Sequence, residues 1–296
     1  MLLYIDKDFA IAFEKEMLSM DPFDNPVEDN AARRLFELFK NYPDLDIYSD
    51  VSQEEKAQIR VFKYLLNLNA VIRNADQLQF ELKKTKLPLQ LLAFTVKRYD
   101  WADKFESKGG LYFTIDDYLK KINEILAFEK IIRFVEIKKP FTWYDIAYIS
   151  KLPADRAFLI DNYLISDEKK RKNNLLPIIK ILSKINATKF VFELFVDEFK
   201  LGWNKTEWEN FEEEINDFKD HEDLDLEVKT TKYSSIGGNS HYDFHDRKLF
   251  LKYIKVEVGK GFDLLPYDHN KINDKKVVVG TIFNKDTYDD FRSYYF

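Results

Sequence analysis

Hydrophobic residues recur with helical spacing over much of the first half of the chain. Between residues 30 and 42 the apolar positions Ala31, Leu35, Leu38 and Phe39 fall on one helical face. Ser52 and Glu55 form a capping-box pair, which predicts a long helix from Ser52 to about Asn74. A further helix is expected from Tyr118 to Val135. Two short apolar runs are strand candidates: Leu2–Asp6 and Leu45–Val51. The first half is therefore predicted to be mainly helical.

The second half alternates between strand-like and helix-like patterns. In its last apolar run, Ile254, Val256 and Val258 share one face while Lys255 and Glu257 share the other. The predicted strands are Arg156–Leu164, Thr188–Val196, Leu224–Thr230 and Leu249–Val258, and the predicted helices are Asn174–Ile185 and Thr206–Phe218. Such alternation predicts a layered α/β domain. A boundary at 151/152 gives two parts, a mainly helical region at 1–151 and an α/β domain at 152–296.

Composition limits the classes of protein and site. A chain of 296 residues that is 45% hydrophobic is long enough for two cores. It contains no cysteine, which excludes disulfides and thiolate zinc sites, and its four histidines are scattered. No apolar run approaches the ~20 residues of a membrane-spanning helix, and no basic region precedes the first apolar stretch. We expect a cytoplasmic protein without a transmembrane segment.

The formal net charge of −6 is spread evenly along the chain. Neither half is a basic domain of the kind that binds nucleic acid by neutralising phosphates. Nucleic acid or another anionic ligand would need a local basic patch. The two candidates are 169–172 and 271–276, and each has acidic neighbours that also fit a solvated loop.

Asp6, Asp8 and Asp50 follow predicted strands, as magnesium ligands do in some nucleases. However, the sequence does not place a convincing third metal ligand at a fixed spacing from this group. We therefore expect neither a metal nor a cofactor.

Two runs near the end of the chain carry more chemistry. The first is His245-Asp246-Arg247, and the second is Gly259-Lys260-Gly261-Phe262-Asp263. An imidazole, a carboxylate and a guanidinium, one strand away from two glycines around a lysine, could hold a phosphate or fix a buried part of the fold.

These runs, with Asp161 and Tyr163 after the first strand and Asn173-Asn174-Leu175-Leu176 opening a helix, give residues 152–296 a family resemblance. The segment resembles the phospholipase-D-like domain at the C-terminus of microtubule-interacting-and-trafficking (MIT) proteins and their bacterial relatives. Between the aspartate and the tyrosine the family has proline, where this chain has Asn162. The resemblance implies a membrane- or partner-binding module, with these binding residues: Asp161, Tyr163, His245, Asp246, Arg247, Lys260 and Asp263.

Hydrolysis in the wider phospholipase D superfamily uses two histidines, each within a His-x-Lys-x4-Asp motif. Counting from His245, Arg247 stands in the place of the lysine and Lys252 in the place of the aspartate. The missing carboxylate is the group that would orient the imidazole. Three roles stay open for His245 and Arg247: structural pairing with Asp161 or Asp263, binding of an anion or partner, and catalysis.

We therefore expect a non-catalytic binding or accessory protein of a bacterial multi-component system, for example one for phage defence. It would engage a protein partner or an anionic ligand. The alternative is a metal-independent phosphodiesterase or nuclease, in which a homodimer brings together two copies of His245. His245 and Arg247 are the candidate catalytic residues of that alternative.

Overall fold

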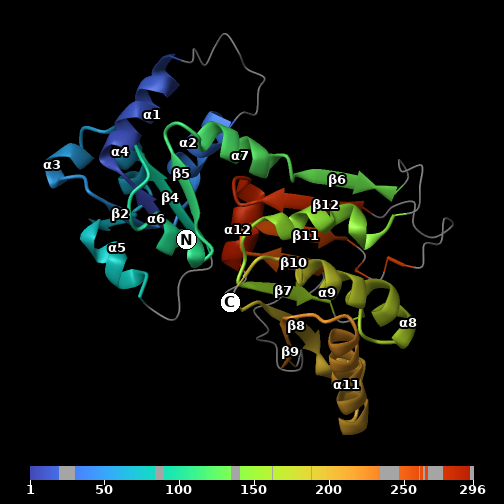
Figure 1. Cartoon of the computed structure of the whole chain (residues 1–296). Helices are drawn as coiled ribbons and strands as arrows, with labels where there is room; N and C mark the ends of the chain where they lie inside the picture. Colours follow the sequence, from blue (N-terminus) through green and yellow to red (C-terminus); the bar gives the residue numbers. More distant parts are fainter. Residues whose placement is uncertain are drawn as a thin grey trace. The chain divides into compact units, whose positions relative to one another are not determined.

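The chain forms two compact units in this computed structural model (Figure 1). Unit 1 comprises Met1–Ala127 and Thr281–Arg292, and unit 2 comprises Phe128–Gly280 and Ser293–Phe296. The structure describes residues 1–19, 31–83, 90–134, 141–161, 163–187, 189–233, 247–259, 261–262, 264–265 and 276–293. The predicted mixed α/β class is confirmed, because each unit contains a sheet with helices.

Unit 1 is organised by a five-stranded sheet in the order β3-β2-β1-β4-β5, with all neighbours parallel. The strands are β1 (Leu2–Ile5), β2 (Asp46–Ser49), β3 (Val71–Asn74), β4 (Leu91–Thr95) and β5 (Leu111–Thr114). The helices are α1 (Lys7–Ser19), α2 (Ala31–Asn41), α3 (Gln53–Lys56), α4 (Arg60–Asn67), α5 (Asp76–Glu81), α6 (Ala102–Ser107), α7 (Tyr118–Leu126) and α12 (Lys285–Ser293). The strand order reverses between β1 and β4, the place where open α/β sheets commonly bind ligands.

The long helix expected from Ser52 to Asn74 is wrong, although the capping box of Ser52 and Glu55 is confirmed. Ile59 has extended backbone angles (φ −80°, ψ 120°) that separate α3 from α4. Asn69 then turns the chain with a positive φ of 58°. The β-branched pair that follows enters the sheet as β3 instead of continuing a helix. Similarly, the helix expected to reach Val135 ends at Leu126.

Unit 2 contains a seven-stranded mixed sheet in the order β6-β12-β11-β10-β7-β8-β9. Its strands are β6 (Lys130–Arg133), β7 (Arg156–Ile160), β8 (Val191–Asp197), β9 (Glu227–Tyr233), β10 (Arg247–Leu251), β11 (Ile254–Val258) and β12 (Lys276–Thr281). Its helices are a 3-10 helix η2 (Trp143–Lys151), α8 (Glu168–Lys170), a π-helix η3 (Arg171–Leu175), α9 (Leu176–Leu182), α10 (Glu198–Leu201) and α11 (Lys205–His221). Strands β7, β8 and β9 are parallel, whereas β10 is antiparallel to β7 and to β11.

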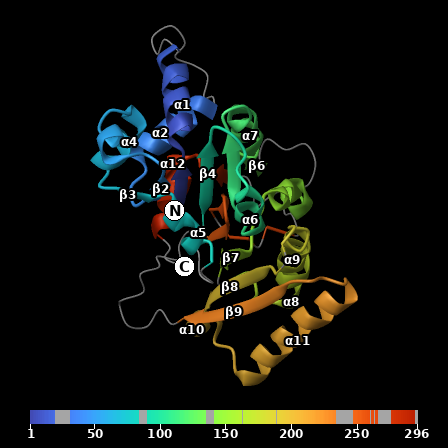
Figure 2. The same cartoon turned by 60° about the vertical axis from the view of Figure 1, so that its left-hand side comes forward.

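The predicted alternation of strands and helices in the second half is confirmed, with one change. The run expected as a single strand, 249–258, is a hairpin of β10 and β11. Helices α9 and α11 cover one face of the sheet (Figure 2), because Ile179 and Phe211 share a core with Leu159, Leu194 and Leu249. This core fixes the ends of β7, β8 and β10.

The structure divides the chain at 127/128, whereas the sequence placed the boundary at 151/152. Residues 128–151 join unit 2, because β6 pairs with β12 and Trp143 is buried in the core of unit 2. Helix α12 returns to unit 1, where Tyr288 stacks on Tyr42 with 4.4 Å between ring centroids. Arg292 of α12 also pairs with Asp44. Because these contacts join segments that are far apart in the sequence, the residues near 127/128 do not themselves indicate a boundary.

This division predicts how fragments behave. A fragment of residues 128–280 should unfold in one cooperative transition, followed by circular dichroism in a denaturant titration. A fragment of residues 152–296 should be less stable, because it lacks β6 and Trp143 and retains an α12 whose packing surface lies in unit 1. Equal stability of the two fragments would contradict this division.

Candidate functional site

The most distinctive chemistry of unit 2 lies at the carboxyl ends of β7 and β8. Asp161 follows β7 and Asp197 ends β8, and they are 1% and 0% exposed. The two strands are adjacent and parallel, so both carboxylates lie at the same edge of the sheet. Strand β10 begins there with Arg247, which the pairing of Lys248 with Ile160 places opposite Asp161. We call this group, with Tyr163 and Phe199, the aspartate edge.

Asp161 joins three segments through its carboxylate. Its Oδ1 accepts hydrogen bonds from the backbone N–H groups of Tyr163 (2.8 Å) and Leu164 (3.2 Å). Its Oδ2 accepts one from the backbone N–H of Phe262 (2.8 Å). The Arg247 Nε lies 3.9 Å from Oδ1. The turn after β7, the start of β10 and the loop after β11 therefore share one buried anion.

Arg247 is held on a second side by an aromatic ring. The centre of its guanidinium lies 4.8 Å from the ring centroid of Tyr163. The Arg247 side chain is 20% exposed, whereas Tyr163 is 45% exposed. Such a contact combines cation–π attraction with planar stacking, which a lysine would not reproduce. The structure therefore brings together Asp161, Tyr163 and Arg247, three of the residues predicted from the sequence.

The glycine-rich loop contributes through its backbone. Gly261 has a φ of 105°, which a residue with a side chain rarely adopts, and its N–H donates to the Val258 carbonyl (3.0 Å). This turn directs the Phe262 N–H to Asp161. The Phe262 ring stacks on Trp143, with 5.4 Å between centroids. The described part of the loop thus anchors β11 to the core of unit 2.

Asn174 is a second buried hub, and the sequence identified it only as part of a helix start. Its Oδ1 accepts from Trp143 Nε1 (3.0 Å) and from the Leu265 N–H (2.9 Å). Its Nδ2 donates to the carbonyls of Lys170 (3.1 Å) and Leu265 (2.9 Å). These four bonds use the full capacity of the amide. Asn174 therefore holds the segment after the glycine-rich loop against the π-helix.

Asp197 repeats the arrangement of Asp161 and was missed by the sequence reasoning. Its Oδ1 accepts from the backbone N–H groups of Phe199 (3.1 Å) and Lys200 (3.4 Å), and Lys200 Nζ lies 3.9 Å from Oδ2. Phe199 is 63% exposed. The signal that could have identified it is an aspartate directly after an apolar strand with an aromatic residue two positions later, as in Asp161 and Tyr163.

The other predicted site residues, His245, Asp246, Lys260 and Asp263, lie outside the described residues. Lys252, which stands where the phospholipase D pattern has an aspartate, lies beyond the far end of β10 from Arg247. It is 2% exposed, and burial lowers the pKa of its ammonium group. Its Nζ lies 3.6 Å from Asp155. This position therefore supplies a buried cation instead of a carboxylate.

The first basic patch is largely neutralised by its neighbours. Arg171 pairs with Glu214 (2.6 Å), and Lys170 lies 3.8 Å from Asp167. Lys172 also pairs with a glutamate in α8. Most of the second patch, 271–275, lies outside the described residues. The described part of the first patch is better suited to a solvated surface than to binding a polyanion.

The switch point of unit 1 is occupied by the protein's own side chains. Asp6 follows β1, and its Oδ1 accepts the N–H of Phe9 (2.7 Å) as α1 begins. Its Oδ2 accepts the N–H of Val96 (3.0 Å) and the hydroxyl of Tyr99 (2.8 Å). Burial and this hydrogen bond raise the pKa of Tyr99. Among the described residues, no group of three or more histidine or acidic side chains could hold a metal ion.

Arg247→Ala should lower the free energy of unfolding by ~2–4 kcal/mol, because Asp161 would remain buried without its guanidinium. Arg247→Lys should recover only part of this loss, since it keeps the charge but not the contact with Tyr163. Arg156→Ala is the control: this arginine begins β7 at the opposite edge and pairs with Asp155 at 3.6 Å, both side chains being 47% exposed. Denaturant titrations giving equal losses for Arg247→Ala and Arg156→Ala would contradict the structural pairing.

Asp6→Ala should cost ~2–4 kcal/mol, because a helix cap and two further hydrogen bonds are lost from a buried position. Asp8→Ala, an exposed change in the same turn, should stay within ~0.5 kcal/mol. In thermal melts, Mg²⁺ should not raise the Tm of the native protein or of the Asp8→Ala variant. A Mg²⁺-dependent rise in Tm that Asp6→Ala abolishes would instead favour a metal site.

Comparisons with known proteins add no relative. No protein-family model matches this sequence, and no curated protein is significantly similar to it. Among the described residues, no helix is long and apolar enough to cross a membrane. The functional conclusion therefore depends on the geometry of the aspartate edge.

Proposed function

We propose that this chain is a non-catalytic binding or accessory protein that engages a protein partner through the aspartate edge of unit 2. The observation that carries the proposal is the position of Arg247 between the buried carboxylate of Asp161 and the ring of Tyr163. The expected phospholipase-D-like character of this region, and a place in a bacterial multi-component system such as phage defence, belong to the same proposal.

Two features argue against phosphodiester hydrolysis. A guanidinium that stabilises a transferring phosphoryl group must direct its donors at the substrate, whereas Arg247 already faces Asp161 and Tyr163. The histidine of a phospholipase D half-site also needs an aspartate to orient it, and Lys252 stands in that position. The alternative enzyme would need other residues to stabilise the phosphoryl group and to orient the histidine.

Two exposed aromatic side chains argue for a binding role. Tyr163 and Phe199 each stand two residues after a buried aspartate that fixes the turn through backbone hydrogen bonds. Their backbones are therefore ordered before any partner arrives, which reduces the entropy lost on binding. Aromatic side chains are enriched at protein interfaces and among the residues that dominate binding energy. The paired cations Lys170, Arg171 and Lys172 make a protein partner a better fit than nucleic acid.

The protein should not cleave DNA, RNA or a phosphodiester reporter in the presence of EDTA. This is expected because the described edge lacks a carboxylate in the orienting position and Arg247 is engaged within the fold. EDTA-resistant turnover that disappears in His245→Ala, with folding intact by circular dichroism, would overturn the proposal and favour the alternative phosphodiesterase.

The binding role is tested by co-expressing the chain with the products of neighbouring genes and identifying proteins that co-purify with it. A partner that co-purifies with the native chain should be lost in Tyr163→Ala and in Phe199→Ala, which remove exposed rings but keep the backbone N–H groups that bond to the two aspartates. Tyr144→Ala is the matched control, because Tyr144 is 49% exposed on η2 and lies outside the aspartate edge. Equal retention of the partner by all three variants would place the interface elsewhere.

A further inference from the structure

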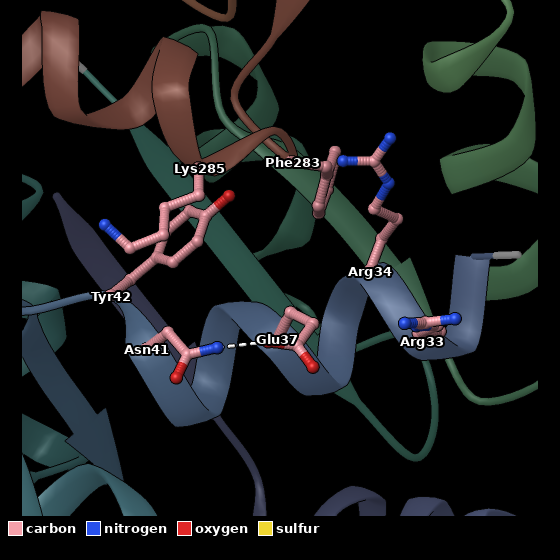
Figure 3. Close-up of a pocket in the computed structure, with 7 residues that line it drawn as sticks. All are labelled: Arg33, Arg34, Glu37, Asn41, Tyr42, Phe283 and Lys285. Atoms are coloured by element: carbon pink, nitrogen blue, oxygen red, sulfur yellow. Dashed lines mark hydrogen bonds between the residues drawn. The ribbon is translucent and has the colours of Figure 1, made fainter. Parts of the chain in front are cut away.

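Unit 1 contains a pocket of about 360 Å³ that no part of the proposed function uses. One wall is α2, and the other is the segment in which the chain returns to unit 1 and begins α12 (Figure 3). Its lining residues are Arg33, Arg34, Glu37, Asn41, Tyr42, Phe283 and Lys285. The volume lies at the lower end of the range for small-molecule sites.

The floor of the pocket is built from packed aromatic side chains. Tyr42 and Phe283 are each 1% exposed. Tyr42 stacks on Tyr288, and Phe283 meets the ring of Phe113 with 6.2 Å between centroids. The pocket is therefore preformed, and a ligand would not need to order its floor.

The charges of the pocket are separated along its length. Figure 3 shows the two arginines at one end and Lys285 at the other, with Glu37 on α2 between them and Asn41 toward the Lys285 end. Glu37 and Asn41 are hydrogen-bonded to each other across one helical turn. The seven helical steps from Arg34 to Asn41 correspond to a rise of ~10 Å. Three cations and one carboxylate line this pocket, in a chain whose net charge is −6.

We propose that the pocket binds a small molecule with an anionic group at each end, joined by a hydroxylated chain or ring, as in a sugar bisphosphate. The terminal cations would each receive one anionic group. Glu37 disfavours an anion at the centre, while its carboxylate and the Asn41 amide one helical turn along α2 can hydrogen-bond to hydroxyl groups of the ligand. Lys285 pairs with Asp289 at 2.5 Å, but both side chains are substantially exposed, so this pair is weak enough to yield to a ligand.

The full-length protein is titrated by calorimetry with fructose 1,6-bisphosphate, fructose 6-phosphate, inorganic phosphate and the hydroxylated dicarboxylate galactarate. The bisphosphate should bind at least about tenfold more tightly than the monophosphate, and Tm should rise with the logarithm of its concentration above Kd. Tighter binding of galactarate would assign the same chemistry to a carboxylate ligand. Equal affinity for the bisphosphate and inorganic phosphate, or no binding of either two-ended probe, would overturn the proposal.

Variants test the two ends separately. Arg33→Ala and Lys285→Ala change exposed side chains, so folding should persist, and each should weaken the two-ended ligand about tenfold. Lys40→Ala is the matched control on the same helix, because Lys40 is exposed, lies over the Phe36 ring and does not line the pocket. Unchanged binding in both end variants, or an equal loss in the Lys40 control, would overturn the proposal. The outcome is independent of partner binding at the aspartate edge of unit 2.

Discussion

The buried carboxylate of Asp161 is the interaction on which the proposed site of unit 2 depends. One side chain accepts backbone hydrogen bonds from the turn after β7 and from the loop after β11, and it faces Arg247 at the start of β10. Removing such a charge from water is costly unless donors surround it, so the three segments stabilise one another through Asp161. The geometry of Tyr163 follows directly from this requirement.

The same physical solution appears at three strand ends. Asp6, Asp161 and Asp197 each follow or end a buried parallel strand, and each accepts N–H groups from the next few residues. A chain leaving a buried strand exposes backbone donors that need an acceptor, and a short carboxylate side chain provides one. Acidic residues after strands in this protein therefore have a structural explanation before a catalytic or metal-binding one.

Local patterns allowed much of the fold to be predicted, and long-range pairing explains what was missed. The strands at β7, β8 and β11 and the capping box at Ser52 depend on residues close in sequence, and they are confirmed. The sequence predicts a helix at β6, because the partner that makes it a strand, β12, lies far along the chain. Asp161 and Arg247 were identified as candidates, but Asp197 was not, because its neighbours resemble an ordinary helix start.

The two units use their charged residues differently, which separates the two proposals physically. At the aspartate edge the cations Arg247 and Lys200 face buried carboxylates, and the rings of Tyr163 and Phe199 are exposed. In the pocket of unit 1 the cations lie at the two ends, and the floor is the aromatic part. An edge with exposed rings suits a protein surface, whereas cations at the two ends of a pocket with a packed floor suit a small anionic molecule. The same chain thus offers two sites whose ligands differ in chemistry, and a ligand of one has no physical reason to compete at the other.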